Sequence, residues 1–537
     1  MSEVLRIEGL NVAIEAPPRP AVSIVKNLSL SIGEGEILGL VGASGSGKSM
    51  TARAIMQLLP PGARMSGSVI LRGETLSSMN ALEIQSVRGR DMGMIFQEPM
   101  AALNPLMRIG DQVAETVRLH RSVSRSAALD LARTALDQVG LSGEAGALDR
   151  LPFELSGGQR QRVAIAMAIV MAPSLLIADE PTTALDVITQ AQVLALLCDL
   201  ARSRGMGLLL VTHDLAVIAQ LADRVAVIQQ GEIVEHGTTA QILQHGRHPY
   251  TQSLLAAARL KPKRAARVSS NAAEVLNVDS VVLEYPRKRR SIFKTEAPLR
   301  ALNGVSLSIR AGETVGLVGE SGSGKSSLLQ VILALRRSTT GGVRLQGSSL
   351  FAAARSEVRQ LRRNIQAVFQ DPVGSFDPRW RVEHLVAEPF FLLDAPPSAA
   401  ERHRKVAEAL DQVGLSASDA QRYPHEFSGG QRQRIAIARA LITQPAVIVF
   451  DEAVSALDVL VREQILQLLA ELAGRANVAY LFVTHDLHVI RAIADRVYVM
   501  QAGNIVEEGE TESVFNAPKH PYTRALIDAT PVLPELI

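Results

Sequence analysis

The chain is 537 residues long, 47% hydrophobic and 20% charged, and carries a formal net charge of +2. This composition is typical of a globular protein, and the near-neutral charge gives no general indication of nucleic-acid binding. The single cysteine, Cys198, excludes a disulfide framework, a cysteine-ligated zinc site and a four-cysteine iron–sulfur cluster. One hydrophobic core does not extend over such a length, so about two to four domains are expected.

The chain start and the apolar stretches bear on its location. The first residues, Met1 to Arg6, lack the basic and then apolar pattern of a secretory signal. The longest uncharged stretch, 163–178, is shorter than the roughly 18–20 residues that span a bilayer, and it contains Pro173. We therefore expect a protein that stays in the cytoplasm, with a buried helix and a buried strand at 163–178.

The elements expected in chain order are the same in both halves. Each half opens with two alternating strands, at 5–7 and 28–32 and again at 276–278 and 305–309, which predict an antiparallel edge layer. Continuous apolar strands alternating with helices follow, as at 37–41, 175–178 and 208–211. This pattern predicts an α/β fold with a parallel sheet covered on both faces.

The chain is an internal duplication. A constant spacing of 272 residues separates Ser156 from Ser428, Glu180 from Glu452 and His213 from His485. We predict one domain over 1–262, a basic and polar linker over 263–275 and a second domain over 276–537. Another basic run, at 287–290 with Lys294, is interpreted as a solvated surface loop or a contact for anionic lipid headgroups.

A glycine-rich loop follows the apolar strand in each half. The sequences at 42–49 and 319–326 both fit G-x-x-x-x-G-K-S, the phosphate-binding loop. Its glycines let backbone N–H groups wrap a polyphosphate, its lysine (Lys48 or Lys325) reaches the β- and γ-phosphates, and the next serine (Ser49 or Ser326) can ligate Mg²⁺. The alternative, a flexible Gly-Ser linker, does not account for two copies that both follow a buried strand.

Two adjacent carboxylates end a second buried strand in each half. Asp179-Glu180 and Asp451-Glu452 each follow four apolar residues, which places them where open α/β sheets bind ligands. A lone Asp-Glu pair is usually an exposed turn. After an apolar tetrad, in a chain with a phosphate loop, we expect the aspartates to hold Mg²⁺ and the glutamates to orient or deprotonate the attacking water.

The decisive stretch is Leu-Ser-Gly-Gly-Gln-Arg-Gln-Arg at 155–162, repeated from Phe427 as Ser-Gly-Gly-Gln-Arg-Gln-Arg at 428–434. A serine with two glycines at a helix start offers a hydroxyl and free N–H groups to an anion. In this context the stretch resembles the signature of the ATP-binding-cassette family, and the resemblance covers both halves almost end to end. It implies two tandem P-loop NTPase domains of the RecA-like type, each with an antiparallel β layer and a helical subdomain, at about 100–160 and 373–432.

The resemblance also implies composite sites and further residue roles. The two cassettes would pack head to tail, so that each ATP lies between the phosphate loop of one half and the signature of the other. His213 and His485, otherwise simple capped residues, would contact the γ-phosphate, and Gln97 and Gln370 would contact Mg²⁺. The positions that match the family's ATP-binding pattern are Gly42, Ser44, Gly45, Gly47, Lys48, Ser49, Met50, Ser156, Gly157, Gly158 and Gln159, with Tyr285, Gly319, Ser321, Gly322, Gly324, Lys325, Ser326, Ser327, Ser428, Gly429, Gly430 and Gln431.

One departure from the family pattern distinguishes the halves. Tyr285 stands where the family stacks an aromatic ring on adenine, but the equivalent residue in the first half is Ile14. Aromatic–base stacking contributes roughly 1–3 kcal/mol, so we expect weaker ATP binding at the Lys48 site than at the Lys325 site.

Further motifs indicate the kind of cassette protein. The two copies of His-Pro-Tyr-Thr, at 248–251 and 520–523, together with the sequences after Gln97 and Gln370, resemble the oligopeptide, dipeptide and nickel importers. Within that family the match is to the fused two-cassette ATPases of peptide and microcin C uptake. The resemblance implies two transmembrane permeases and a substrate-binding protein as partners, with the chain bound peripherally at the cytoplasmic face of the inner membrane.

A second class of function stays open at this point. Soluble twin-cassette ATPases act on ribosomes or DNA instead of powering transport. The ribosomal class is expected to have a long charged helical linker, whereas about 27 residues separate Thr251 from the strand near Val278. The DNA-repair class is expected to have cysteine-rich zinc modules, which one cysteine cannot form.

Overall fold

The computed structural model describes residues 2–16, 19–98, 102–141, 147–183, 185–259, 272–286, 297–351, 355–372, 374–455, 457–476 and 478–534. The chain divides into two compact units, with Met1–Arg259 in the first and most of Leu260–Thr530 in the second. Most of the predicted linker, the second basic run at 287–294 and residues 99–101 lie outside the described residues. Strand β11 starts at Glu274, inside the range predicted for the linker, because the alternating strand pattern begins there.

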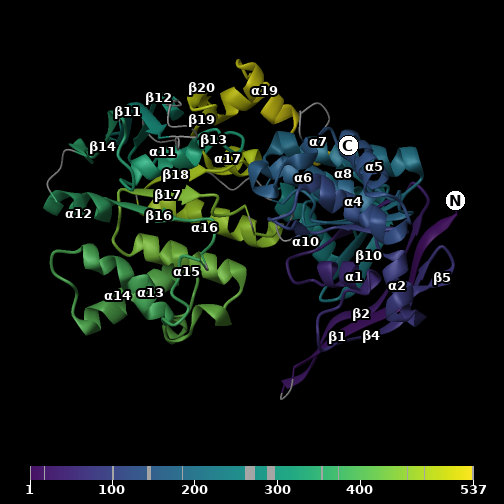
Figure 1. Cartoon of the computed structure of the whole chain (residues 1–537). Helices are drawn as coiled ribbons and strands as arrows, with labels where there is room; N and C mark the ends of the chain where they lie inside the picture. Colours follow the sequence, from purple (N-terminus) through teal and green to yellow (C-terminus); the bar gives the residue numbers. More distant parts are fainter. Residues whose placement is uncertain are drawn as a thin grey trace. The chain divides into compact units, whose positions relative to one another are not determined.

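The first unit contains ten strands and nine longer helices among its described residues. Many of them are labelled in Figure 1. The strands are β1 (Glu3–Ala16), β2 (Arg19–Gly33), β3 (Ile37–Val41), β4 (Ala63–Leu71), β5 (Glu74–Thr75), β6 (Met92–Ile95), β7 (Leu175–Asp179), β8 (Gly207–Thr212), β9 (Arg224–Gln229) and β10 (Glu232–Thr238). The helices are α1 (Lys48–Ile55), α2 (Ala81–Val87), α4 (Ile109–His120), α5 (Arg125–Gln138), α6 (Gly157–Ile169), α7 (Val187–Arg204), α8 (Leu215–Leu221), α9 (Thr239–His245) and α10 (Pro249–Arg259), with short 3-10 turns at Leu76–Ser78, Ala147–Asp149 and Pro152–Glu154.

A six-stranded sheet in the order β10-β9-β3-β8-β7-β6 forms the centre of the first unit. Strands β9, β3, β8, β7 and β6 are parallel, and only the edge strand β10 pairs antiparallel. All residues of β3, β7 and β8 are buried, as the continuous apolar runs predict. Strand β6 ends at Ile95, and Phe96 and Gln97 follow it.

The two faces of this sheet build two cores. Along β7, Leu175 and Ile177 join one hydrophobic cluster, and Leu176 and Ala178 join the other, because successive side chains of a strand point to opposite faces. One cluster includes α1 and the antiparallel sheet β2-β1-β4-β5. The other includes the helices α4, α5, α6 and α7. The parallel sheet is thus covered on both sides, and the predicted antiparallel layer is confirmed.

The second unit repeats this plan. Its strands are β11 (Glu274–Tyr285), β12 (Leu299–Arg310), β13 (Thr314–Val318), β14 (Thr340–Leu345), β15 (Ser348–Ser349), β16 (Ile365–Val368), β17 (Val447–Asp451), β18 (Ala479–Val483), β19 (Arg496–Gln501) and β20 (Asn504–Glu510). Its helices are α11 (Lys325–Ile332), α12 (Arg355–Asn364), α13 (Val382–Ala387), α14 (Ala399–Gln412), α15 (Gly429–Leu441), α16 (Val459–Ala476), α17 (Leu487–Ile493), α18 (Thr511–Asn516) and α19 (Pro521–Asp528), with 3-10 turns at Glu388–Leu392, Ala417–Gln421 and Pro424–Glu426.

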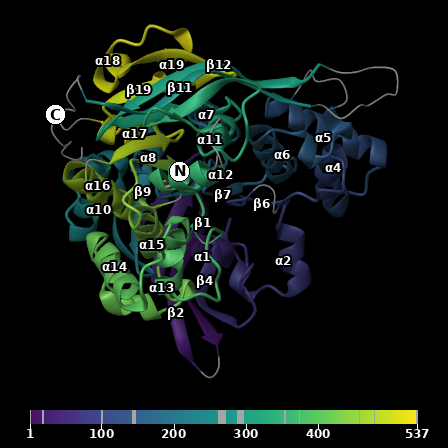
Figure 2. The same cartoon turned by 90° about the vertical axis from the view of Figure 1, so that its left-hand side faces the viewer.

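The sheets of the second unit have the same orders, β16-β17-β18-β13-β19-β20 and β12-β11-β14-β15. Helices α13, α14 and α15 pack on one another and form the helical subdomain, which stays together in both views (Figures 1 and 2). Helices α4, α5 and α6 form the equivalent group in the first unit. Within the described ranges, no helix combines the length and the apolar character needed to cross a bilayer.

Candidate nucleotide sites

In the first unit the phosphate loop connects β3 to α1, the arrangement that the motif requires. Gly47 has φ +106°, a left-handed conformation that L side chains rarely adopt. At Gly42 an added Cβ would lie 2.3 Å from the carbonyl oxygen of Ile228, so only glycine fits between loop and β9. The sequence places glycine at these positions because the backbone has no space for a side chain.

Lys48 is 5% exposed and lies over the loop. Its Nζ donates to the carbonyl oxygens of Gly42 (2.7 Å) and Ala43 (2.9 Å). Burial lowers the pKa of Lys48, while the carboxylates of Glu180 and Asp179 act in the opposite direction. The ammonium group is therefore held at the mouth of the loop, with two carboxylates nearby.

Asp179 ends β7 beside the first residues of α1. The Ser49 hydroxyl donates to its Oδ1 at 3.0 Å. Burial raises the pKa of Asp179, and the neighbouring Glu180 carboxylate raises it further, although the bond from Ser49 lowers it. A partly desolvated carboxylate next to a hydroxyl is an oxygen donor pair of the kind that Mg²⁺ prefers.

Glu180 is the centre of a small polar cluster. Its carboxylate lies 3.1 Å from Nδ1 of His213, and it accepts from Nε2 of Gln97 (2.9 Å) and the hydroxyl of Thr183 (3.1 Å). Burial raises the pKa of Glu180, but the hydrogen bonds from His213 and Thr183 and the charges of His213 and Lys48 together outweigh it, and the net shift is downward. The carboxylate is thereby kept ionised and oriented, as a general base for water must be.

The backbone of this glutamate is unusual in both units. Glu180 and Glu452 each have φ +48°, in the left-handed region that costs an L residue roughly 1–2 kcal/mol. The conformation is held because the Glu180 N–H donates to the Val211 carbonyl (2.9 Å) and the Glu452 N–H to that of Val483 (2.8 Å). The apolar pattern before the carboxylates did not reveal this backbone conformation.

The second unit reproduces the same machinery. Lys325 donates to the carbonyls of Gly319 (2.7 Å) and Glu320 (2.8 Å). Nδ1 of His485 lies 3.1 Å from the carboxylate of Glu452. Burial raises the pKa of Asp451, and the pKa of Glu452 is lowered because His485 and Lys325 together outweigh the effect of burial. Gln370 follows β16 and is exposed, as Gln97 is after β6.

The signature residues cap a different helix from the one that carries the loop. Ser156 is the N-cap of α6 and accepts from the Gln159 N–H at 3.2 Å, and Ser428 caps α15 in the same way through Gln431 at 3.3 Å. The Gln159 side chain reciprocates by accepting from the Ser156 N–H. Helix α6 packs against α4, α5, β6 and α7, and none of these elements contains the phosphate loop.

Two glycines follow each of these N-cap serines. A Cβ at Gly158 would lie 2.4 Å from Cγ2 of Thr189, and one at Gly430 would lie 2.4 Å from Cγ1 of Val461. Gly157 and Gly429 have no such close neighbour. The second glycine is thus required by packing on the next helix, and the first leaves the helix start open to an anion.

The positions predicted to contact adenine differ between the units. Tyr285 ends β11, and its hydroxyl lies 3.2 Å from that of Ser327 and 3.4 Å from Gln330 on α11. The Arg336 guanidinium lies over the ring, 4.6 Å from its centroid. In the first unit Ile14 on β1 and Met50 on α1, equivalent to Tyr285 and Ser327, are apolar, so the hydrogen-bonded pair has no counterpart there.

Two further residues touch the loops, and the sequence motifs gave them no role. The Tyr250 hydroxyl accepts from the Ala43 N–H at 2.7 Å, and the Tyr522 hydroxyl accepts from the Glu320 N–H at 2.8 Å. Both tyrosines belong to the His-Pro-Tyr-Thr stretches. The sequence feature that could have identified them is the spacing of these stretches, which are 272 residues apart like the other repeated motifs.

Comparison with known proteins gives matches along the whole chain. The family model "ABC transporter" matches residues 25–183 and 302–455. The model "Oligopeptide/dipeptide transporter, C-terminal region" matches 234–280 and 506–536. The glutathione import ATP-binding protein GsiA of Escherichia coli (strain K12) is 44% identical over 563 residues, which cover 98% of this chain and 90% of the relative. GsiA of Salmonella typhimurium is likewise 44% identical, and the match covers 99% of this chain and 90% of the relative.

Among solved structures, a dimeric ATP-binding cassette in a post-hydrolysis state with ADP and Pi is 32% identical, with a TM-score of 0.40. The match covers 44% of this chain and 98% of the chain in that structure. The family models and the near full-length relatives agree with the duplicated loop, carboxylate pair and signature described above. The chain therefore belongs to the ATP-binding proteins of ABC transporters, and its two units are ATPase cassettes of that family.

Proposed function

We propose that this chain powers the import of small peptides through a membrane ABC transporter. The observation that carries the proposal is the oligopeptide/dipeptide C-terminal region, which matches the end of both units. The glutathione importers among the relatives fit the same class, since glutathione is a tripeptide. Glutathione is accordingly the first substrate to test, with dipeptides, longer oligopeptides and microcin C-like peptides as the other members of the class.

The residues present fit ATP with Mg²⁺. Inside the two loops the hydroxyls of Ser46 and Ser323 are buried and have no hydrogen-bond partner among the described residues, as expected of donors reserved for phosphate oxygens. Ser49, Gln97 and Asp179 offer only oxygen ligands in the first unit, and Ser326, Gln370 and Asp451 do so in the second. Mg²⁺ bound by these residues and by phosphate would neutralise charge that develops on the γ-phosphoryl group.

The residues of each cluster divide the reaction between them. Glu180 and Glu452 orient and deprotonate the water that attacks the γ-phosphorus in line with the leaving oxygen. His213 and His485 keep the glutamates ionised and contact the γ-phosphate. Lys48 and Lys325 stabilise the phosphate charge. Catalysis is then positioning of the reacting groups and stabilisation of the charge that develops on them.

Each ATP, we propose further, is bound by the loop of one cassette and the signature of the other. One site combines Lys48 with Ser428, Gly429 and Gly430, and the other combines Lys325 with Ser156, Gly157 and Gly158. The support is that loop and signature occur on separate elements in each unit, and that every unit has one copy of both. ATP binding would close the pair, and hydrolysis would reopen it.

Occlusion of ATP in the E180Q/E452Q background tests the pairing. Lys48→Ala should remove one of two occluded ATP molecules per chain, and adding Ser428→Arg should remove no more, because both changes damage the same site. Lys48→Ala with Ser156→Arg should abolish occlusion. The reverse outcome for these two double variants would mean that each site lies within one cassette.

The partners follow from the import function. We propose that the helical subdomains, α4–α6 and α13–α15, receive two transmembrane permeases, and that a substrate-binding protein delivers the peptide to them. The chain would then lie on the cytoplasmic face of the inner membrane as a peripheral subunit.

Co-purification and reconstitution test the import proposal. The chain should co-purify with two hydrophobic permeases, and glutathione or another short peptide with its binding protein should stimulate ATP hydrolysis in the reconstituted complex. Co-sedimentation with ribosomes or retention on DNA, without permeases, would overturn import in favour of the other twin-cassette class.

A further inference from the structure

The His-Pro-Tyr stretch of each unit holds the phosphate loop through a tyrosine hydroxyl. Tyr250 on α10 accepts from the Ala43 N–H, and Tyr522 on α19 accepts from the Glu320 N–H, at 2.7 and 2.8 Å. Ala43 and Glu320 are the second residues of their loops. The two contacts join positions more than 200 residues apart in sequence, and they occur with the same geometry in units whose local sequences differ.

The residue held by the tyrosine also holds the loop lysine. The Ala43 carbonyl accepts from Nζ of Lys48 at 2.9 Å and from the N–H of Ser46 at 3.2 Å. In the second unit the Glu320 carbonyl accepts from Lys325 at 2.8 Å and from Ser323 at 3.2 Å. One residue of each loop is therefore fixed on its N–H side by tyrosine and on its carbonyl side by lysine.

A carboxylate on the edge strand positions the tyrosine. Glu235 on β10 accepts from the N–H groups of Arg247 (2.7 Å) and His248 (3.1 Å), and Nδ1 of His248 accepts from the Tyr250 N–H at 3.2 Å. Pro249 is well suited to the first position of α10, since it has no N–H to satisfy there. The turn that begins α10 is thus fixed before the hydroxyl reaches the loop.

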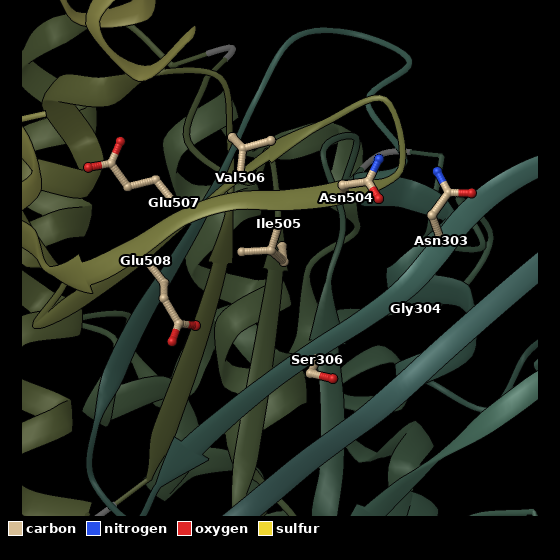
Figure 3. A pocket seen from close by; sticks show the side chains of 8 residues that line it. All are labelled: Asn303, Gly304, Ser306, Asn504, Ile505, Val506, Glu507 and Glu508. Carbon is tan, nitrogen blue, oxygen red and sulfur yellow. The ribbon is translucent and has the colours of Figure 1, made fainter. Parts of the chain in front are cut away.

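The second unit has the same arrangement on β20. Glu507 accepts from Lys519 (2.8 Å) and His520 (3.0 Å), and His520 accepts from the Tyr522 N–H at 3.2 Å. Figure 3 shows Glu507 next to Glu508 at one end of a surface hollow, with Asn303 and Asn504 at the other. Glu507 is therefore part of the wall where β20 lies against β12, and it links this wall to the His-Pro-Tyr turn.

We propose that Tyr250 and Tyr522 are positioning residues for nucleotide binding, which hold the phosphate loop in its binding conformation through the N–H of its second residue. Without the hydroxyl, this N–H and the peptide next to it can turn. Part of the binding free energy of ATP is then spent on ordering the loop, so the affinity falls. The inference rests on the assignment of these loops to ATP. It gives the oligopeptide-type C-terminal region a direct role in the nucleotide site.

The test is Tyr250→Phe, Tyr522→Phe and both together in the full chain, with the affinity for a fluorescent ATP analogue and the nucleotide-free melting temperature as readouts. Phenylalanine keeps the ring and removes only the hydroxyl. Loss of one hydrogen bond to a part-buried N–H predicts about fivefold to tenfold weaker binding per altered site. The nucleotide-free melting temperature should stay close to wild type. Tyr423→Phe, which removes a hydroxyl in the helical subdomain, is the matched control and should leave the affinity unchanged.

A second variant keeps the test independent of the tyrosine itself. Glu235→Ala releases the turn that positions Tyr250, so it should weaken binding in the same direction, and combining it with Tyr250→Phe should add little. A lower nucleotide-free melting temperature with unchanged affinity would make the tyrosine a packing residue only and overturn the proposal. If the wild-type chain failed to bind ATP, the assignment of the loops would be at fault instead of the tyrosine.

Discussion

The two cassettes are alike in their phosphate loops and carboxylate pairs and unlike at the position predicted to contact the adenine base. Both units have a buried lysine over the loop, an aspartate at the strand end and a glutamate with φ +48° next to a histidine at 3.1 Å. At the adenine position the second unit has Tyr285 bonded to Ser327, and the first has Ile14. Transfer of the phosphoryl group requires a fixed geometry, whereas the adenine contact contributes affinity alone and can differ between the sites.

A smaller difference lies around the glutamates. Gln97 and Thr183 both donate to the Glu180 carboxylate. In the second unit Ser455, equivalent to Thr183, donates to the main-chain carbonyl of Glu452 at 2.8 Å instead. The first glutamate is therefore held by more side chains than the second, although the sequences retain the same carboxylate.

The largest expected effect tests the shared part of the comparison. Glu180→Gln and Glu452→Gln together should leave ATP bound and lower ATP turnover by about 10²- to 10⁴-fold, because each site loses its general base. The measurement is steady-state hydrolysis beside nucleotide retention. Substantial hydrolysis in the double variant would show that other groups activate the water.

The base-binding difference predicts unequal affinities. Tyr285→Ala should weaken ATP binding at the Lys325 site by about 5- to 100-fold, the equivalent of losing one aromatic–base stack. Ile14→Tyr should strengthen binding at the Lys48 site. Affinities are measured with the opposite lysine disabled. Equal affinities in the two single-site parents, Lys325→Ala and Lys48→Ala, would remove the asymmetry.

The contacts of the histidines with the glutamates predict how the pH dependence of ATP hydrolysis changes when a histidine is removed. Burial raises the pKa of Glu180 and His213 lowers it, so His213→Ala should raise the pKa of that carboxylate. Activity requires the ionised form, which is lost as pH falls through the pKa, and the acidic limb of the kcat profile therefore moves to higher pH. The pH profile of His213→Ala is recorded in the Glu452→Gln background, so that only the Glu180 site contributes. The reciprocal variant, His485→Ala with Glu180→Gln, should show the same shift. His236→Ala, on exposed β10, is the control; an unmoved limb in His213→Ala would contradict this role of the histidine.

The smallest expected effect separates the two glutamates. Thr183→Val removes a donor from the Glu180 carboxylate and should lower kcat at that site about two- to tenfold, the range of one hydrogen bond. Ser455→Ala removes a bond to the backbone of Glu452, so it should change kcat less. Single-site turnover measures both, and equal losses would mean that these hydroxyls act only on the loop structure.

Much of the site was predictable because its parts are short and local. The loop glycines, the lysine and the N-cap serine of the signature are defined by short local motifs, and the structure places them at the junction of β3 and α1 and at the start of α6. The contact between Tyr250 and Ala43 was not predicted, because 207 residues separate its partners and no local pattern records which hydroxyl meets which N–H. The backbone conformation of Glu180 was not predicted because glutamate is not among the residue types enriched at φ > 0.

The sequence by itself determined the duplication, the order of strands and helices, and the residue types proposed to bind phosphate and Mg²⁺, because periodicity and motif spacing are properties of the chain. Only the tertiary structure decided which side chains meet across the unit. Burial of the sheet brings β7 and β8 side by side, so Glu180 reaches His213, and the packing of α10 brings a tyrosine to the phosphate loop. Such contacts depend on where distant segments come together when the core forms, and that is specified by the fold as a whole.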